Sequence, residues 1–335
     1  MTRSFKRLLV AGGAGFIGSN FVRSMRSAHP DVKVTVFDKL TYAGNRANLA
    51  GLDADFVQGD ICDAPAVDAA ARDCDAIVNF AAETHVDRSL LDAHAFIDTD
   101  VRGTAVLCEA ARKFEHQVLL LVSTDEVYGH VASGRSREDD LLAPRSPYSA
   151  SKAGGEHIAR AYAASFGVPL LITRGSNTYG PNQYPEKLVP VLITNAIDDM
   201  PLPLYNDGSA VRDFLHADDH CRAIDLVLHE APLGGTYNVG TGLETSGLQV
   251  AEAVLEIMGK PRSLIEFVAD RPGHDYRYAL DIGRITDLGW EPGTTFADGL
   301  RRTVEWYRAN EGWWRPLKSG EYWEFYRKNY RPLVR

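Results

Sequence analysis

The chain has 335 residues and a formal net charge of −9, from 36 lysines and arginines against 45 aspartates and glutamates. Its hydrophobic fraction of 45% is ordinary for a globular protein, which excludes a disordered, collagen-like or low-complexity chain. An acidic protein is a poor match for nucleic acid or anionic membranes, because both attract basic surfaces. Four widely spaced cysteines predict neither a disulfide framework nor a metal site. Since no apolar run reaches the roughly eighteen residues of a membrane span, we expect a soluble, cytoplasmic protein.

Short apolar runs alternate with helical patterns through the first half of the chain. Strands are predicted at 8–11, 32–37, 55–57, 76–80 and 118–122, and helices at 16–28, 64–72 and 91–114. Another helix should run from 146 to 166, with Ser146 as its cap and Gly167 at its end, followed by a strand at 168–173. Apolar strands separated by helices predict a doubly wound α/β fold, with a parallel sheet covered on both faces.

A glycine-rich loop lies between the first strand and the first helix. It reads GGAGFIG from Gly12 to Gly18, and Asp38 stands twenty positions later at the end of the second strand. Glycines let the backbone approach a pyrophosphate, and the helix N-terminus supplies N–H donors. A carboxylate at Asp38 would bind an adenine ribose and repel a 2′-phosphate. A glycine turn without a ligand is the alternative, but strand, helix and acid in this order favour a Rossmann-type NAD site.

The second half of the chain is organised differently. Beyond about residue 175 prolines and glycines become frequent and the alternation loosens. We therefore expect 1–175 to form mainly the NAD-binding domain, with later segments of about 210–240 returning to it. The remainder, 176–335, should form mainly a smaller interleaved lobe. The aromatic tail from 312 to 330 is expected to dock on the body rather than to bind a ligand.

Two groups of residues could carry acid–base chemistry. Tyr148 and Lys152 lie four positions apart on one face of a predicted helix, where an ammonium should lower the phenol pKa so that it can take a proton from an alcohol. Thr124, Asp125 and Glu126 follow a strand. Paired carboxylates are usually a solvated turn, but here they suit an acid and a base with separated pKa values. Both can serve one pocket only if the backbone leaves strand geometry after Thr124.

Together with the segments at 81–89, 185–188 and 271–275, these motifs resemble the dTDP-glucose 4,6-dehydratases, a family in the extended branch of the short-chain dehydrogenase/reductase superfamily. The resemblance implies that an internally recycled NAD oxidises C4 of dTDP-glucose, that water is lost across C5 and C6, and that the hydride returns to C6, giving dTDP-4-keto-6-deoxyglucose. It also implies the roles of the site residues. Tyr148, helped by Thr124 and Lys152, would take the 4-hydroxyl proton. Glu126 would remove the C5 proton, and a protonated Asp125 would donate to the leaving C6 hydroxyl.

Other expectations follow from the same resemblance. Extended relatives pair the helices at 91–114 and 146–166, so a homodimer is expected. A nucleotide-sugar epimerase or decarboxylase of the same superfamily is the alternative activity, and a non-catalytic NAD-binding regulator is a third reading. The Asp125–Glu126 pair favours the dehydratase over the second, and the intact acid–base set argues against the third.

The resemblance also implies two sets of contacts. The expected NAD contacts are Gly12, Gly15, Phe16, Ile17, Gly18, Asp38, Lys39, Leu40, Thr41, Asp60, Ile61, Phe80, Ala81, Ala82, Thr84, Thr99, Tyr148, Lys152 and Thr178. The expected sugar-nucleotide contacts are Thr84, His85, Thr124, Asp125, Glu126, Tyr148, Asn177, Glu186, Lys187, Leu188, Pro203, Tyr205, Arg212, Arg271, His274, Asp275 and Tyr278.

Some of these contacts have alternative explanations. Arg212 and Arg271 are candidates for the diphosphate, because a guanidinium fork suits phosphate oxygens, but either could be a surface ion pair. His85 and His274 could equally be structural hydrogen-bonding residues. The chain departs from the family pattern at Asp100, Gly175, Thr178, Tyr276 and the loop 241–246. These departures leave open whether a thymidine or a uridine nucleotide is preferred.

Overall fold

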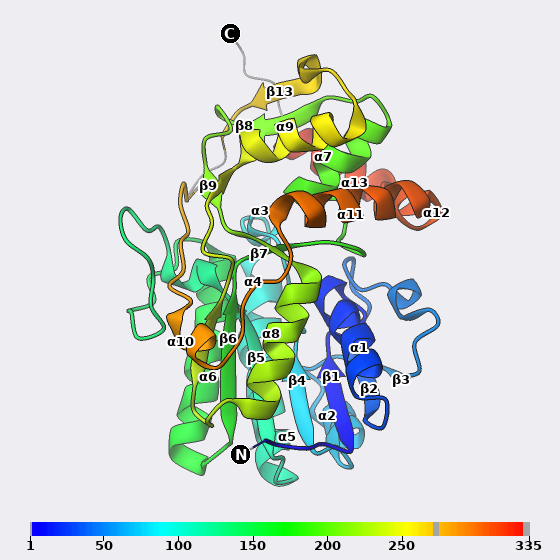
Figure 1. The fold of residues 1–335 in the computed structure, drawn as a ribbon. Helices are drawn as coiled ribbons and strands as arrows, with labels where there is room; N and C mark the ends of the chain where they lie inside the picture. Colours follow the sequence, from blue (N-terminus) through cyan, green and yellow to red (C-terminus); the bar gives the residue numbers. More distant parts are fainter. Residues whose placement is uncertain (1, 271–274, 331–335) are drawn as a thin grey trace.

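A seven-stranded parallel sheet forms the centre of the larger lobe in the computed structural model, which describes residues 2–270 and 275–330 (Figure 1). The strand order is β11-β6-β5-β4-β1-β2-β3. The strands are β1 (Arg7–Ala11), β2 (Lys33–Asp38), β3 (Asp55–Gln58), β4 (Ala76–Asn79), β5 (Val118–Thr124), β6 (Leu170–Gly175) and β11 (Thr236–Val239). Chain order reverses between β1 and β4, which is the point where open α/β sheets bind ligands beyond their carboxyl ends.

Helices cover both faces of this sheet, which confirms the predicted doubly wound α/β class. On one face, α1 (Phe16–Ala28) and α8 (Ala217–Glu230) pack side by side (Figure 1). They share an apolar core with alternate strand residues such as Leu8 and Val10. The other face carries α2 (Ala64–Ala71), α5 (Thr104–Lys113) and α6 (Pro147–Phe166), over a core that includes Leu9. The side chains of neighbouring strand residues thus enter opposite cores, as the pleat requires.

The ends of α6 follow the predicted capping pattern. The Ser146 hydroxyl accepts from the Ser149 N–H, Pro147 occupies the first turn, and Gly167 ends the helix with a left-handed φ of 71°. Glycine is suited to that last position because it adopts positive φ without strain.

The predicted regular helix at 91–114 is wrong in detail. The Asp92 side chain caps α4 (Ala93–Phe96), so the helical segment begins at Ala93. A π-helical stretch, η2 (Ile97–Gly103), follows before α5. This wide turn packs against α6 at a close backbone approach, because a Cβ on Gly155 would lie 2.5 Å from the Asp100 carbonyl oxygen. The local 3.6-residue pattern in the sequence does not contain this tertiary contact.

The smaller lobe has its own apolar core, which includes Leu192, Val254 and Trp314. Its main elements are α7 (Leu188–Ile197), β8 (Leu202–Tyr205), α9 (Gly247–Met258), β13 (Ile265–Val268), α11 (Phe296–Ala309), α12 (Glu311–Trp314) and α13 (Gly320–Asn329). Short elements complete the described fold: η1 (Arg46–Leu49), α3 (Val86–Ser89), η3 (Asp125–Tyr128), β7 (Asn177–Tyr179), β9 (Val211–Arg212), β10 (Phe214–His216), β12 (Thr245–Ser246), η4 (Arg262–Leu264), α10 (Gly283–Asp287) and η5 (Arg315–Leu317). The tail docks as expected, with Trp314 and Tyr322 almost fully buried.

Two further expectations concern the whole chain. Among the described helices there is none whose length and apolar character would let it cross a bilayer. Within the described residues all four cysteines are unpaired, as their spacing predicts.

Candidate active site

A cavity of about 210 Å³ lies at the carboxyl ends of the central strands, where β1, β2 and β4 end. Most of the residues expected to contact NAD line it. They are Gly12, Gly15, Phe16, Ile17, Gly18, Asp38, Lys39, Thr41, Asp60, Ile61, Phe80, Ala81, Ala82, Thr84, Thr99, Tyr148 and Lys152. Leu40 and Thr178 are not part of its described lining. The Thr178 hydroxyl lies instead 2.8 Å from His220 Nδ1.

The glycine-rich loop is packed too closely against neighbouring backbone to carry side chains at two of its positions. Gly12 has a φ of 75°, and a Cβ there would lie 2.3 Å from the Ala81 backbone nitrogen. A Cβ on Gly18 would lie 2.3 Å from the Gly12 carbonyl oxygen. Glycines are therefore required at both positions, and they bring the loop backbone and the start of α1 to the wall of the cavity. This arrangement fits a dinucleotide pyrophosphate at a helix N-terminus.

Asp38 lies at the end of β2 on the same wall. Its carboxylate accepts from the backbone N–H groups of Ala14 and Leu40, at 2.9 and 2.8 Å. Burial raises the pKa of this carboxyl group, while the two N–H donors oppose that shift. A carboxylate accepts about four hydrogen bonds, so Asp38 can hold the loop and still bind a ribose diol. Leu40 thus supports the site through its backbone, although its side chain is not on the wall.

The turn that carries the two candidate acids begins where β5 ends. The backbone leaves strand geometry directly after Thr124 and forms η3, as the paired-acid hypothesis requires. The Thr124 hydroxyl accepts from the Glu126 N–H at 3.3 Å and donates to Asp125 Oδ1 at 3.2 Å. The Ser149 hydroxyl, from the first turn of α6, donates to Glu126 Oε2 at 3.3 Å.

The two acids of this turn lie in different environments. The Asp125 side chain is buried, and its Oδ2 has no hydrogen-bond partner among the described residues. Burial, followed by the charge of Glu126, raises the pKa of Asp125 to about 8, so the group holds its proton at neutral pH. Glu126 instead lines a second cavity, described below. Thr124 and Asp125 are not on the described walls of either cavity.

Tyr148 and Lys152 project from the first turns of α6 into the first cavity. Lys152 Nζ donates to the Val122 carbonyl oxygen at 3.0 Å. The expected lowering of the Tyr148 pKa is wrong for this structure. Burial raises that pKa well above its ordinary value, and the charges of Glu126, Asp100 and Asp125 add to the shift, whereas a hydrogen bond with Thr124 opposes it. Burial of the phenol, with the neighbouring carboxylates adding to it, therefore sets the direction of the shift.

The second cavity, of about 180 Å³, adjoins the first and gathers most of the expected sugar-nucleotide residues. They are His85, Glu126, Asn177, Glu186, Lys187, Leu188, Pro203, Tyr205 and Arg212. Thr84 and Tyr148 line the first cavity, and Glu186 and Lys187 line both. The two cavities thus meet at Glu186, whose buried carboxylate accepts from Arg88 at 2.8 Å.

Arg212 is a buried residue of this cavity and not a surface ion pair. Its guanidinium lies 4.5 Å from the centre of the Tyr278 ring and donates to the Asp275 carbonyl oxygen at 2.5 Å. The Tyr278 hydroxyl in turn donates to the Asp275 carboxylate at 2.7 Å, so these two residues support Arg212 from outside the described cavity wall. The other expected phosphate ligand, Arg271, and His274 lie outside the described residues.

Sequence reasoning missed several residues of the walls. Gln183 and Tyr184 line the first cavity, and Asp87, Phe214 and Tyr330 line the second. The proline- and glycine-rich segment around 180–190 could have indicated the first pair, because such segments often close over ligands. Tyr330 corrects the expectation that the aromatic tail only docks on the body. It comes from the far end of the described chain, and local pattern gives no signal for that contact.

Comparison with known proteins gives consistent results. Residues 9–303 match the family model described as GDP-mannose 4,6 dehydratase. A dTDP-glucose 4,6-dehydratase of Streptomyces niveus is 49% identical over 323 residues, covering 93% of this chain and 96% of the relative. The low-salt glycan biosynthesis protein Agl12 of Haloferax volcanii is 50% identical over 308 residues, covering 91% and 99%.

Solved structures show the same fold. The dTDP-glucose 4,6-dehydratase DesIV of Streptomyces venezuelae, with NAD and TYD bound, superposes with a TM-score of 0.91 at 51% identity, over 93% of this chain and all of that one. A UDP-glucose 4-epimerase of Thermus thermophilus in complex with NAD superposes with a TM-score of 0.85 at 32% identity, over 91% and 99%. The dehydratases are thus considerably more similar in sequence than this epimerase.

Proposed function

The chain belongs to the GDP-mannose 4,6-dehydratase family, and from that premise we propose that it is an NAD-dependent hydro-lyase that converts dTDP-glucose to dTDP-4-keto-6-deoxyglucose. The observation that carries the proposal is the pair of acids on η3, a buried Asp125 that holds its proton and a Glu126 that faces the second cavity. An elimination of water needs one group to donate a proton and another to accept one, and this pair supplies both.

The cofactor's place follows from the first cavity. The cradle of Gly12, Gly15 and Gly18 would hold the pyrophosphate, Asp38 the adenine ribose, and Tyr148 and Lys152 the nicotinamide end. When bound, NAD supplies the hydride chemistry, removing a hydride from C4 and returning it to C6. No net redox change results, which means that the cofactor stays bound through turnover.

The oxidation of C4 needs a base for the 4-hydroxyl proton. We assign this proton transfer to Tyr148, whose phenol lies at the cavity wall. The Thr124 hydroxyl lowers the phenol pKa by hydrogen bonding, and Lys152 is the cation within one helical turn that can stabilise the phenolate. Because burial opposes ionisation of Tyr148, this assistance is needed for the phenol to ionise, and the phenolate then accepts the 4-hydroxyl proton.

The elimination follows from the new ketone at C4, which acidifies the C5 proton. Glu126 removes that proton, the C6–O bond breaks, and Asp125 gives its proton to the departing hydroxyl, so that one water leaves. Glu126 then returns its proton to C5 as C6 receives the hydride. Tyr148 is left with the 4-hydroxyl proton and Asp125 without its own, so a proton must leave Tyr148 and one must return to Asp125, directly or through solvent, before the next turnover. The roles fit the two environments, because the buried acid begins with the proton and the acid at the cavity wall begins without it.

The sugar nucleotide would occupy the second cavity. The guanidinium of Arg212 and, from outside the described residues, Arg271 would bind the diphosphate. Asn177, Glu186 and Lys187 would position the sugar, and Tyr205 and Pro203 would border the nucleoside. This assignment would divide the chain into 1–175 with about 210–240 for NAD, and 176–335 mainly for the sugar nucleotide.

The protein's assembly and compartment are further parts of the proposal. We propose a cytoplasmic homodimer paired through α6 and the helical segment from α4 to α5. Apolar side chains at this surface support the pairing, since Ile97 is 51% exposed and Phe166 57% exposed. Four cysteines that form no disulfide with one another in the described residues are consistent with a reduced compartment.

The decisive experiment is incubation of the protein with dTDP-glucose, followed by mass spectrometry of the nucleotide sugar. The expected product has lost one water, and Glu126→Gln should not form it. UDP-glucose run in parallel measures base selectivity. Isomerisation without a mass change would replace the proposal with an epimerase, and a lack of reaction with either substrate would reject it.

A further inference from the structure

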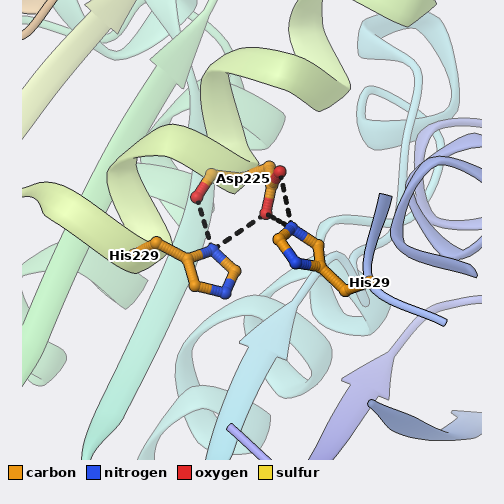
Figure 2. A group of neighbouring side chains, drawn as sticks. All are labelled: His29, Asp225 and His229. Carbon is orange, nitrogen blue, oxygen red and sulfur yellow. Dashed lines mark hydrogen bonds and ion pairs between the residues drawn. The ribbon is translucent and has the colours of Figure 1, made fainter. Parts of the chain in front are cut away.

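Two histidines and one aspartate converge on the face of the sheet that α1 and α8 cover (Figure 2). His29 directly follows α1, and Asp225 and His229 lie four positions apart on α8. One oxygen or nitrogen from each of the three residues lies within 4.8 Å of the others. The i, i+4 spacing puts the two α8 side chains on one face of that helix, and α1 brings His29 against them from 196 positions away.

This cluster is separate from the active site. Helix α1 begins at the carboxyl end of β1, where the cofactor cavity lies, so its last turn reaches the opposite edge of the sheet. The last turn of α8 lies at the same opposite edge (Figure 1), because the parallel strand β11 starts shortly after it in the chain. None of the three residues lines either cavity of the active site. The proposed reaction therefore gives the cluster no role.

In the absence of an ion His29 and His229 each hydrogen-bond to the Asp225 carboxylate, and these two contacts bring the atoms to separations close to those of ligands around a metal ion. His29 Nε2 lies 3.1 Å from both Asp225 carboxylate oxygens, and His229 Nδ1 lies 2.9 Å from Asp225 Oδ1. In a tetrahedral zinc site with bonds of about 2.0 Å, neighbouring ligand atoms lie about 3.3 Å apart. The separations here are within a few tenths of an ångström of that value.

The orientation of the rings supports the same reading. The His29 and His229 rings lie nearly parallel, with centroids 4.6 Å apart and an interplanar angle of 18°. Figure 2 shows one nitrogen of each ring facing the same carboxylate. His229 Nδ1 also lies 3.0 Å from the Asp225 carbonyl oxygen, so without a metal this nitrogen carries a proton that an incoming ion must release to solvent.

The surroundings leave room for a ligand. The cluster borders a surface depression of about 400 Å³ that Thr2, Arg222, Glu230 and Glu291 also line. Arg222 is engaged by Asp219 at 2.6 Å, and Glu230 accepts from the Thr2 hydroxyl at 3.1 Å. Open space beside three donors allows water to complete the coordination.

We propose that His29, Asp225 and His229 bind a first-row divalent transition-metal ion, with Zn²⁺ as the preferred ion. Two imidazoles and one carboxylate are a donor set typical of this ion, and they leave the fourth coordination position to water. The ion ties the end of α1 to α8 and so joins segments that are far apart in the sequence. Its role is structural, because the site lies at the sheet edge opposite the cofactor cavity.

The test uses the full-length, untagged protein after treatment with a chelator. Titration with Co²⁺, followed by visible absorption, and calorimetric titration with Zn²⁺ should each saturate at one ion per chain. Zn²⁺ should also raise the melting temperature by a few degrees, because it binds only the folded chain. Absence of saturable binding in the micromolar range overturns the proposal.

Matched variants locate the site. His29→Ala and the nearly isosteric Asp225→Asn should each weaken binding at least tenfold and abolish the zinc-dependent rise in melting temperature. His130→Ala, which removes an exposed histidine outside the cluster and outside the proposed dimer surface, should bind like the unmodified protein. Circular dichroism of each metal-free variant establishes that it is folded. Unchanged binding in His29→Ala and Asp225→Asn would place the ion elsewhere and overturn the assignment.

Discussion

Asp125 keeps its proton because it is buried next to a second acid. If that proton drives departure of the C6 hydroxyl, Asp125→Asn should lower the rate of water loss by about 10²–10⁴-fold, the usual contribution of a general acid. Removal of the C5 proton, which we assign to Glu126, should continue in this variant. In deuterated solvent, mass spectrometry should therefore find deuterium in nucleotide sugar that has not lost water.

Glu126→Gln is the matched comparison, since it changes the neighbouring acid by the same chemistry. It should abolish both deuterium uptake and water loss. Deuterium uptake that survives in Glu126→Gln but disappears in Asp125→Asn would require the two roles to be exchanged.

The buried Asp125 also predicts how the free energy of unfolding depends on pH. In the folded chain the pKa of Asp125 is about 8, whereas an unfolded aspartate titrates near 3.9. Between these values the folded state holds the extra proton, so the free energy of unfolding falls as pH rises, by at most about 1.4 kcal/mol per pH unit. Asp125→Asn removes this slope and should gain stability relative to the unmodified protein from pH 5 to pH 8. Urea unfolding at both pH values measures the difference, and a constant difference would contradict the burial argument.

Residues in local motifs could be assigned from the sequence, while their environments could not. Gly12 and Asp38 lie in a continuous strand–loop–helix–strand segment, so spacing alone placed them at the cavity. The pKa of Tyr148 depends first on its burial and then on Glu126 and Asp100, which reach it from other elements. A motif that contains only Tyr148 and Lys152 therefore suggests the wrong direction of the shift.

At the scale of elements, a buried ion pair holds η3, the turn that carries Asp125 and Glu126, in place. Glu156 on α6 accepts from Arg174 on β6 at 2.6 Å, and both side chains are almost fully buried. Arg174 also donates to the hydroxyl of Tyr128, a residue of η3, at 2.6 Å. Glu156→Gln leaves the arginine charge uncompensated and should cost about 3–5 kcal/mol in denaturant unfolding. The turnover rate of the proposed reaction should fall as well, because η3 carries the two acids.

An exposed ion pair provides the control for Glu156→Gln. Glu311 and Arg315 lie one helical turn apart and remain nearly half exposed. Glu311→Gln should therefore change the free energy of unfolding by less than about 0.5 kcal/mol. Equal losses in the two variants would show that burial is not the deciding factor.

The elements themselves were predictable wherever their signals are local. Ser146, Pro147 and Gly167 define the ends of α6 by capping chemistry that involves only neighbouring residues. The π-helical η2 was not predictable, because it is associated with a close contact between Asp100 and Gly155, 55 positions apart.

On the scale of the whole molecule, sequence suggested an interleaved second lobe but not where the two lobes join. Arg88 and Glu186 form that junction across 98 positions, and Glu186 lines both cavities. Such a contact depends on how the lobes pack, and neither residue belongs to a periodic pattern. The same reasoning explains why Tyr330 was missed.

A single substitution of an apolar residue by a charged one tests the proposed dimer. Light scattering of the purified protein at micromolar concentration should give twice the chain mass of 36.9 kDa. Ile97 is 51% exposed on the helical surface assigned to the pairing, and Ile97→Asp would bury a carboxylate without a partner there. That variant should elute as a folded monomer. Leu233→Asp, at a residue that is also 51% exposed but follows α8 on the other face of the sheet, should remain dimeric. If the unmodified protein is monomeric, or if both variants stay dimeric, the chains do not pair through these helices.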